Sequence, residues 1–164
     1  MQFFTLFTLS AMLMTTAFAQ RGIGGVRADA CDPTPQLPAL DLWAQNRFTT
    51  IVEAANATAL TAAFNAFWSK DVSITLNGVA ISTADYQAKR MGRGYGGTIQ
   101  YMESIAVPTM ANSSEEGEVS LFFNNDINGS NVTSAINLVI RPDLSVPGPD
   151  NRRVQVLDQV LYGL

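Results

Sequence analysis

The sequence predicts an α+β domain in which helices come first and a curved antiparallel sheet follows. Apolar residues recur at helical spacing up to residue 69, and the period changes to strand-like alternation at Val72. After residue 97, four long segments are rich in Val, Ile, Leu and Phe. Hydrophobic residues make up 47% of the 164 residues and charged residues 15%, so a disordered polar chain is excluded.

The first predicted elements are two helices. Asp41 offers an N-cap for the first, and the apolar residues that follow it lie at roughly helical spacing. A sequon at Asn56 interrupts this pattern. We expect the second helix from about Thr58 to Ser69, with its large apolar side chains on one face.

A short hairpin and a third helix are predicted next. Residues 72–76 alternate between apolar and polar, Asn77-Gly78 is a hairpin turn signal, and residues 79–81 form a short return strand. The motif Ser82-Thr83-Ala84-Asp85 resembles a capping box, with Asp in place of Glu. It predicts a helix from Thr83 to about Arg90.

Four long strands complete the predicted fold. They are expected over residues 98–107, 118–127, 134–141 and 153–162, with polar turns between them. Such lengths and spacings favour a four-stranded antiparallel meander.

Strict alternation along these strands places three polar residues on the predicted inner face, namely Glu103, Asn125 and Asp158. A buried carboxylate without a partner costs several kcal/mol, so in a hollow these groups indicate a small-molecule site. The alternative is that each lies where its strand leaves the sheet and meets water. The aromatic residues of the candidate pocket are Trp68, Tyr86 and Tyr101, for which plain core packing is the alternative.

The opposite face of the predicted sheet is mostly polar, but each strand adds one apolar residue to it. These residues are Met102, Phe122, Val139 and Leu157. An aligned apolar stripe on a surface is typical of an interface, so we expect a homodimer. An unrelated surface patch is the alternative.

One stretch carries a family resemblance. The segment FNAFWSKDVSI at residues 64–74, followed by Asn77-Gly78 and by residues 82–86, resembles the nuclear-transport-factor-2-like superfamily, and the last strand is also similar. The resemblance covers residues 41–164. It implies that the sheet curls around the helices into a cone with an inner pocket, as in SnoaL-like polyketide cyclases. Members of this superfamily include enzymes and non-catalytic binding proteins, so the fold does not fix the function.

The residue types present restrict the possible chemistry. The chain has no histidine and one cysteine, which excludes Ser-His-Asp and Cys-His catalysis and leaves no expected zinc site. We expect neither metal nor cofactor. The resemblance implies His-containing or Asp-Arg-Asp catalytic sets for some enzymes, and these sets are missing here. The sequence therefore favours a non-catalytic protein that binds a small apolar ligand or another protein.

The alternative function is that of a SnoaL-like cyclase or isomerase. It would use Glu103 or Asp158 as a general base. A nucleic-acid partner is not expected in either case, because the net charge is −4 and the sequence has no basic run.

The N-terminal region predicts export. Residues 1–19 are apolar and uncharged after Met1, and they end in Ala17-Phe18-Ala19, so we expect a cleaved signal peptide and no membrane attachment afterwards. A membrane anchor is the alternative. Residues 20–40 are rich in Gly and Pro and predict an extended arm, in which Cys31 either pairs between chains or stays a free thiol.

Sequons support the same route. They occur at Asn56, Asn112, Asn128 and Asn131. Chance predicts roughly one or two in a sequence of this composition. The expected product is therefore a secreted, extracellular glycoprotein.

Overall fold

The computed structural model describes residues 37–110 and 113–162. The predicted signal peptide at 1–19, most of the predicted arm at 20–40 with Cys31, and the sequon at Asn112 lie outside the described residues. Within the described part, no helix combines the length and the apolar character that crossing a membrane requires.

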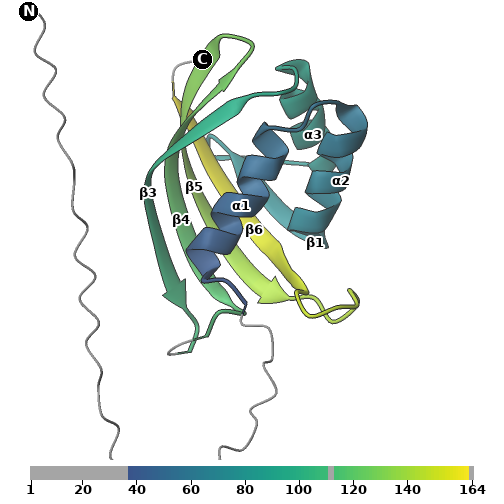
Figure 1. Ribbon diagram of the computed structural model, residues 1–164, viewed down its shortest axis with the longest axis vertical. Helices are drawn as coiled ribbons and strands as arrows, with labels where there is room; N and C mark the ends of the chain where they lie inside the picture. Colours follow the sequence, from purple (N-terminus) through teal and green to yellow (C-terminus); the bar gives the residue numbers. More distant parts are fainter. Residues whose placement is uncertain (1–36, 111–112, 163–164) are drawn as a thin grey trace, which may run out of the picture. The chain divides into compact units, whose positions relative to one another are not determined.

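The described residues form three helices and one six-stranded sheet, which confirms the predicted α+β class (Figure 1). In chain order the elements are α1 (Leu40–Val52), α2 (Ala57–Phe67), β1 (Trp68–Leu76), β2 (Val79–Ile81), α3 (Thr83–Gly92), β3 (Thr98–Pro108), β4 (Gly117–Ile127), β5 (Ser130–Pro142) and β6 (Arg152–Tyr162).

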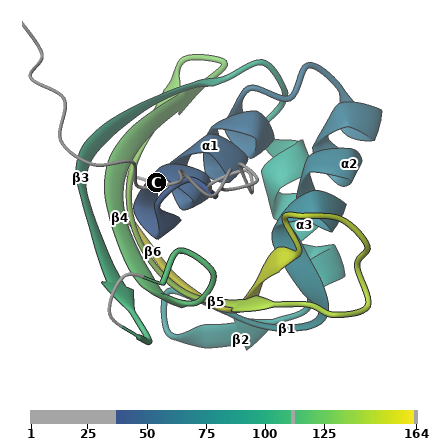
Figure 2. The same ribbon diagram turned by 60° about the horizontal axis from the view of Figure 1, so that its bottom comes forward.

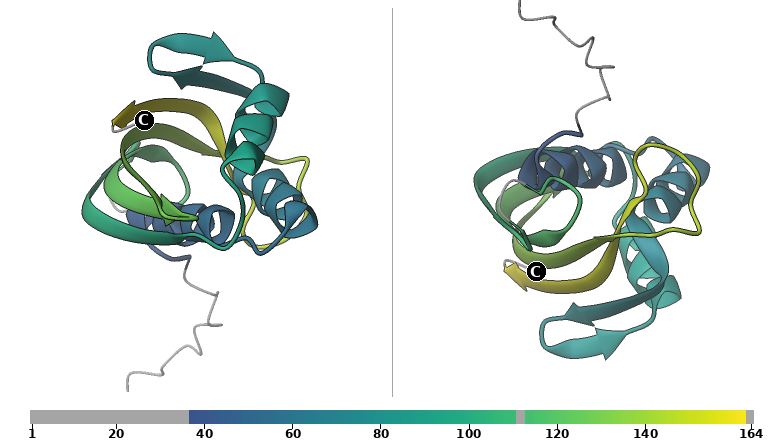
Figure 3. Two further views of the ribbon diagram at one scale, coloured as in Figure 1. Left: turned by 90° about the horizontal axis from the view of Figure 1, so that it is seen from above. Right: turned by 90° about the horizontal axis from the view of Figure 1, so that it is seen from below.

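The strand order in the sheet is β2-β1-β6-β5-β4-β3. The four long strands form the expected antiparallel meander. The β1–β2 hairpin joins the same sheet, because β1 pairs in parallel with β6, and it forms one edge of the sheet (Figure 3). The sheet is therefore mixed, and the parallel pair links the start of the sheet to its last strand.

Local signals explain most element boundaries. The Asn77-Gly78 turn has positive φ at both residues, 50° and 77°, as a tight hairpin requires. Ser82 caps α3 by accepting a hydrogen bond from the Asp85 amide, as the capping box predicts. The predicted N-cap at Asp41 was wrong. The helix begins at Leu40, whose side chain is buried, and Asp41 lies in its first turn.

The core lies between the helices and the concave face of the sheet. α1 packs along β3 and β4, and the strands curve around it (Figure 2). Phe48 of α1 contacts Phe123 of β4 and Phe67 of α2, with ring centroids 5.1 and 5.9 Å away. These aromatic contacts fix α1 inside the curve of the sheet.

Two β-bulges interrupt the regular register of the long strands. In β3, Tyr101 pairs with Phe123 and Glu103 with Phe122, so Met102 is an extra residue. In β6, Val154 pairs with Ile140 and Val156 with Val139, so Gln155 is a second extra residue. A bulge bends its strand and moves every later side chain to the opposite face.

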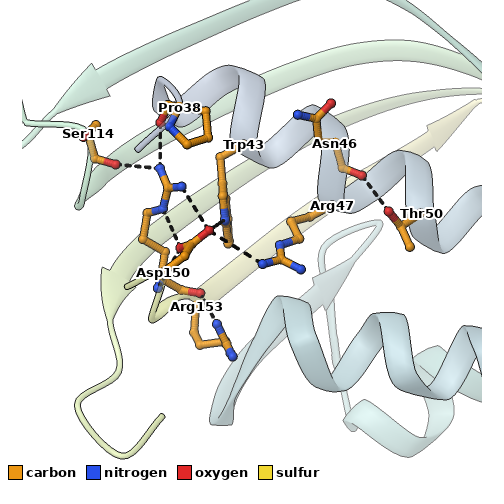
Figure 4. A network of polar contacts seen from close by, with 9 residues as sticks. Pro38, Trp43, Asn46, Arg47, Thr50, Ser114, Asp150 and Arg153 are labelled. Carbon is orange, nitrogen blue, oxygen red and sulfur yellow. Dashed lines mark hydrogen bonds and ion pairs between the residues drawn. The ribbon is translucent and has the colours of Figure 1, made fainter. Parts of the chain in front are cut away.

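A buried guanidinium connects three segments of the chain at one end of the domain (Figure 4). The side chain of Arg152 is fully buried and donates to the carbonyl oxygens of Pro38 and Ser114, each at 2.8 Å. It also donates to both oxygens of Asp150, at 2.9 and 3.1 Å, and lies 5.2 Å from the Trp43 ring centroid. Arg152 therefore connects the start of α1, the β3–β4 loop and the start of β6.

We predict that Arg152→Ala lowers the free energy of unfolding by about 3 kcal/mol, because it leaves two carbonyls and a carboxylate without their buried donor. Urea denaturation of the purified protein measures the loss. The matched control is Arg47→Ala, which removes a partly exposed guanidinium 3.7 Å from the same carboxylate. Its loss should stay below about 1 kcal/mol. Equal losses in the two variants would contradict the assigned role of Arg152.

The same network predicts an acid dependence of stability. Burial raises the pKa of the Asp150 carboxyl, but the hydrogen bonds and charge of Arg152 outweigh burial and hold this pKa below its usual range. A lowered folded-state pKa contributes stability above the unfolded value of about 3.9, and this contribution is lost as the pH falls further. Unfolding free energies measured from about pH 6 to pH 3 should therefore fall less steeply in Asp150→Asn than in the wild type. Parallel curves would refute this.

Candidate functional site

A pocket lies inside the cone, between the C-terminal half of α1, α3 and the inner face of the sheet. It encloses about 50 Å³. Its apolar lining residues are Phe48, Ile51, Val52, Leu76 and Leu161. Its polar lining residues are Tyr86, Lys89, Arg90, Arg93, Asn125 and Gln159. A mostly apolar hollow with a few convergent polar groups is the usual form of a small-ligand site.

A chain of hydrogen bonds crosses one wall of this pocket. The Tyr86 hydroxyl donates to Oε1 of Gln159 at 2.6 Å, and Nε2 of Gln159 donates to Ser134 Oγ at 3.4 Å. All three side chains are buried. They hold the Gln159 amide in one orientation, so this wall of the pocket is preorganised.

A second polar pair belongs to the lining. Asn125, on the inner face of β4, is buried, and its Oδ1 accepts a hydrogen bond from Nη2 of Arg93 at 2.9 Å. Arg93 directly follows α3 and is half-buried. The strand therefore orients the guanidinium that follows the helix.

Arg90 holds α3 against α1. Its guanidinium donates to the carbonyl oxygens of Ile51 and Val52 at 3.1 and 2.7 Å, and to that of Gly94 at 2.6 Å. The last carbonyls of a helix have no partner within the helix, and a cation near them is favourable. Arg90 thus completes the end of α1 and positions the pocket wall that α3 supplies.

The electrostatics of the pocket favour hydrogen-bond donation. Burial raises the pKa of the Tyr86 phenol far above its usual value, although the nearby charges of Arg90 and Arg93 oppose this effect. Tyr86 is therefore a neutral donor at physiological pH. Among the described residues that line the pocket there is no carboxylate. The lining can bind and orient a ligand, but it offers no group suited to take up a proton near neutral pH.

Of the predicted aromatic and amide residues, the structure places two in the pocket and two elsewhere. Tyr86 and Asn125 line the pocket, as expected. Trp68 instead packs in the core, stacked on Phe64 at a centroid distance of 4.5 Å. Tyr101 is half-buried and donates to a main-chain carbonyl of α1 at 2.7 Å. Plain packing, the alternative weighed from the sequence, therefore describes the last two.

The expected inner position of the two carboxylates was wrong. Glu103 and Asp158 are exposed, and both lie on the outer face of the sheet. The physical cause is the same in each strand, because each residue follows a bulge, at Met102 or at Gln155. Strict alternation therefore fails from the bulge onwards.

Of the four predicted outer-face residues, one lies in the core instead. Met102 and Phe122 are exposed, and Val139 lies on the outer face opposite Val156. The predicted outer position of Leu157 was wrong, since it is fully buried in the core beyond the Gln155 bulge. The bulges bring Ile105 and Val156 to the outer face instead, where each is exposed.

Sequence reasoning missed the cationic residues and Gln159. A basic residue near the end of a helix normally indicates a solvent-facing position, so Lys89, Arg90 and Arg93 carried no signal of a pocket. Strict alternation along the last strand would place Gln159 on the outer face, and the bulge turns it inwards. The Gly-rich loop after α3 was the one available sequence signal of a close approach between this loop and the sheet. At Gly97 a Cβ would lie 2.7 Å from the Asp126 carbonyl oxygen of β4.

A larger and more open groove of about 380 Å³ lies between α3, the start of β1 and the β5–β6 loop. Most of its lining residues are polar, Lys70, Gln87, Asp143 and Arg153 among them, but Trp68 and Val146 also line it. It lacks the enclosing apolar walls of the inner pocket, which remains the better candidate for a small-ligand site.

Comparison with known proteins identifies the fold. No protein-family model matches the sequence, and no curated protein matches it at a significant level. Among solved structures, Mtr2 of Candida albicans matches with a TM-score of 0.55 and 12% identity, over 74% of this chain and 92% of that one. The complex of Mtr2 with the M domain of Mex67 matches with a TM-score of 0.55 and 11% identity, over 75% and 94% of the two chains.

An NTF-2-like protein of unknown function from Pseudomonas aeruginosa is similar as well. Its TM-score is 0.52 at 15% identity, over 74% of this chain and 94% of that one. At such identities the likeness shows the fold alone. The chain has the α+β cone fold of nuclear-transport-factor-2-like proteins, as the resemblance in the sequence implied.

Proposed function

We propose that this chain is a secreted glycoprotein that binds a small ligand in the inner pocket without transforming it. The observation that carries the proposal is the composition of the pocket wall. Apolar side chains enclose the space, while Tyr86, Gln159 and Asn125 present polar groups that are already held by hydrogen bonds. Preorganised polar groups among apolar walls lower the entropic cost of binding.

The positions of the carboxylates favour binding over catalysis. A cyclase or isomerase of this fold needs a carboxylate beside its substrate as general base. Glu103 and Asp158, the two residues that the sequence offered for this role, lie on the far side of the sheet from the pocket. A proton abstracted in the pocket would therefore have no acceptor among the lining residues described above.

The sequons are compatible with a secreted glycoprotein. Asn56, Asn128 and Asn131 are exposed. Asn56 caps α2 through its Oδ1, which accepts from the Ala59 amide at 2.9 Å, so its Nδ2 is available for a glycan while the cap is kept. The N-terminal sequence supplies the remaining support for export.

We predict that filling the pocket abolishes ligand binding. Leu76→Trp places an indole at the pocket wall, whereas Val79→Trp places one on the exposed β2 strand. The measurement is a thermal-shift and calorimetric titration of the purified protein with a panel of small apolar ligands. The wild type should bind at least one of them, and Leu76→Trp should weaken that binding at least about tenfold.

Val79→Trp, Glu103→Gln and Asp158→Asn serve as controls and should keep the wild-type affinity, because all three positions lie outside the pocket. Absence of any binding by the wild type would remove the proposed function. Loss of binding in Glu103→Gln or Asp158→Asn would instead favour the enzyme alternative.

A second copy of the chain is the proposed partner of the outer face. Large apolar side chains are exposed there on three different strands, and they are Met102, Ile105, Phe122 and Val156. A hollow of about 120 Å³ between β3, β4 and β5 provides a recess beside them. Exposed apolar patches of this kind mark protein–protein contacts, and a self-complementary face gives a two-fold dimer.

We predict that the purified protein is a dimer in solution and that Phe122→Asp makes it monomeric, because a buried carboxylate would face the apolar partner surface. Size-exclusion chromatography with light scattering gives the mass. Val79→Asp changes an apolar residue of β2, 63% exposed against 39% for Phe122, and should leave the dimer intact. A wild type of monomeric mass would dispose of the dimer without affecting the ligand proposal.

A further inference from the structure

We propose that the inner pocket selects small carboxylates, that is, ligands with a short hydrocarbon body and one anionic head. This inference rests on the proposed ligand-binding function and adds the chemical class of the ligand.

The charge of the lining is opposite to that of the whole chain. The chain has a net charge of −4, yet the pocket is lined by three cationic side chains, Lys89, Arg90 and Arg93, and by none of the described carboxylates. Within the described residues, none of these three cations forms an ion pair. A cluster of cations beside a partly enclosed apolar space is the electrostatic complement of an anion.

The three cations differ in the hydrogen bonds that they already make. Arg90 is 8% exposed and is committed to main-chain carbonyls, and its Nε is a buried donor without a partner. Arg93 donates to Asn125 through Nη2 alone, with a longer contact of 3.4 Å to the Ser130 carbonyl. Lys89 is exposed at the rim. Arg93 and Lys89 therefore have N–H groups free to bind a ligand, whereas buried Arg90 contributes positive charge.

The cations are incompletely neutralised by the protein. Burial lowers the pKa of Arg90, and the charge of Arg93 lowers it further. Burial also lowers the pKa of Arg93, while Asp126 opposes this effect. The Asp126 carboxylate is engaged elsewhere, because its Oδ1 accepts from the Gly129 amide at 2.8 Å. An anion in the pocket would relieve the repulsion between the two guanidinium groups.

The size and polarity of the space indicate a carboxylate rather than inorganic phosphate. About 50 Å³ accommodates a few non-hydrogen atoms. Phe48, Ile51 and Leu161 supply apolar wall that a hydrated phosphate could not use, whereas a short-chain acid could bury its hydrocarbon part there. The planar guanidinium of Arg93 matches the geometry of carboxylates and phosphates alike, so the apolar wall makes the distinction between the two anions.

The test uses ligand pairs that differ in charge and hardly at all in shape. Calorimetric titrations of the purified protein with acetate and acetamide, and with propionate and propionamide, measure the preference at neutral pH. Inorganic phosphate forms a third arm. At least one acid should bind about tenfold or more tightly than its amide, because charge-assisted hydrogen bonds replace neutral ones. Phosphate should bind more weakly than that acid.

Two variants locate the selectivity. Arg93→Gln and, independently, Lys89→Gln should each reduce the preference for the acid over its amide by several-fold. Lys89 is exposed, so its variant tests the proposal even if the Arg93 variant is unstable. Arg141→Gln removes an exposed cation from β5 outside the pocket and should keep the full preference.

The outcomes separate this inference from the function on which it rests. Equal binding of each acid and its amide, or a preference that survives in both variants, overturns the carboxylate selectivity and leaves the pocket as a ligand site. Tighter binding of phosphate than of either acid also overturns it. If neither pair nor any apolar ligand binds, the proposed function itself has failed.

Discussion

The two β-bulges are the constraint on which the sheet and both of its surfaces depend. Regular strands already give a sheet a twist, and an extra residue in a strand adds a local bend and more twist. Here the extra residues are Met102 in β3 and Gln155 in β6. Between them, β4 and β5 keep perfect pairing over eleven residue pairs, from Gly117–Ile140 to Ile127–Ser130. The curvature is therefore introduced in the strands that flank this regular pair.

This distribution explains how much of the fold could be predicted from the sequence. Helices, turns and strands follow from local periodicity, and the capping motif at Ser82 and the turn at Asn77-Gly78 lie where the sequence places them. The faces of β4 and β5 were also predictable, because alternation holds along both, and Asn125 was correctly expected on the inner face. The parallel pairing of β1 with β6 was not predicted, since it joins segments about eighty residues apart and leaves no local pattern.

The candidate site was less predictable for the same physical reason. Neither bulge contains a glycine that could have revealed it, so alternation was extended through Met102 and Gln155, and Glu103 and Asp158 were placed in the pocket. The cations were invisible for a different reason. Arg90 is buried by contacts with the end of α1, which only the tertiary structure brings beside α3, and its partners are main-chain carbonyls that no residue type identifies.

One cause thus accounts for the character of both faces. Because of the bulges, the two carboxylates do not line the pocket, and Gln159 does. The charged groups of the lining are therefore the cations of α3 and Arg93. The same inversion turns Ile105 and Val156 outwards, where they join Phe122 on the exposed face. Because adjacent residues of one strand point to opposite faces, a substitution of Phe122 changes the exposed outer face, while its neighbour Phe123 keeps its contact with Phe48 of α1. A single thin sheet thereby borders a cationic, apolar pocket on one side and carries exposed apolar side chains on the other.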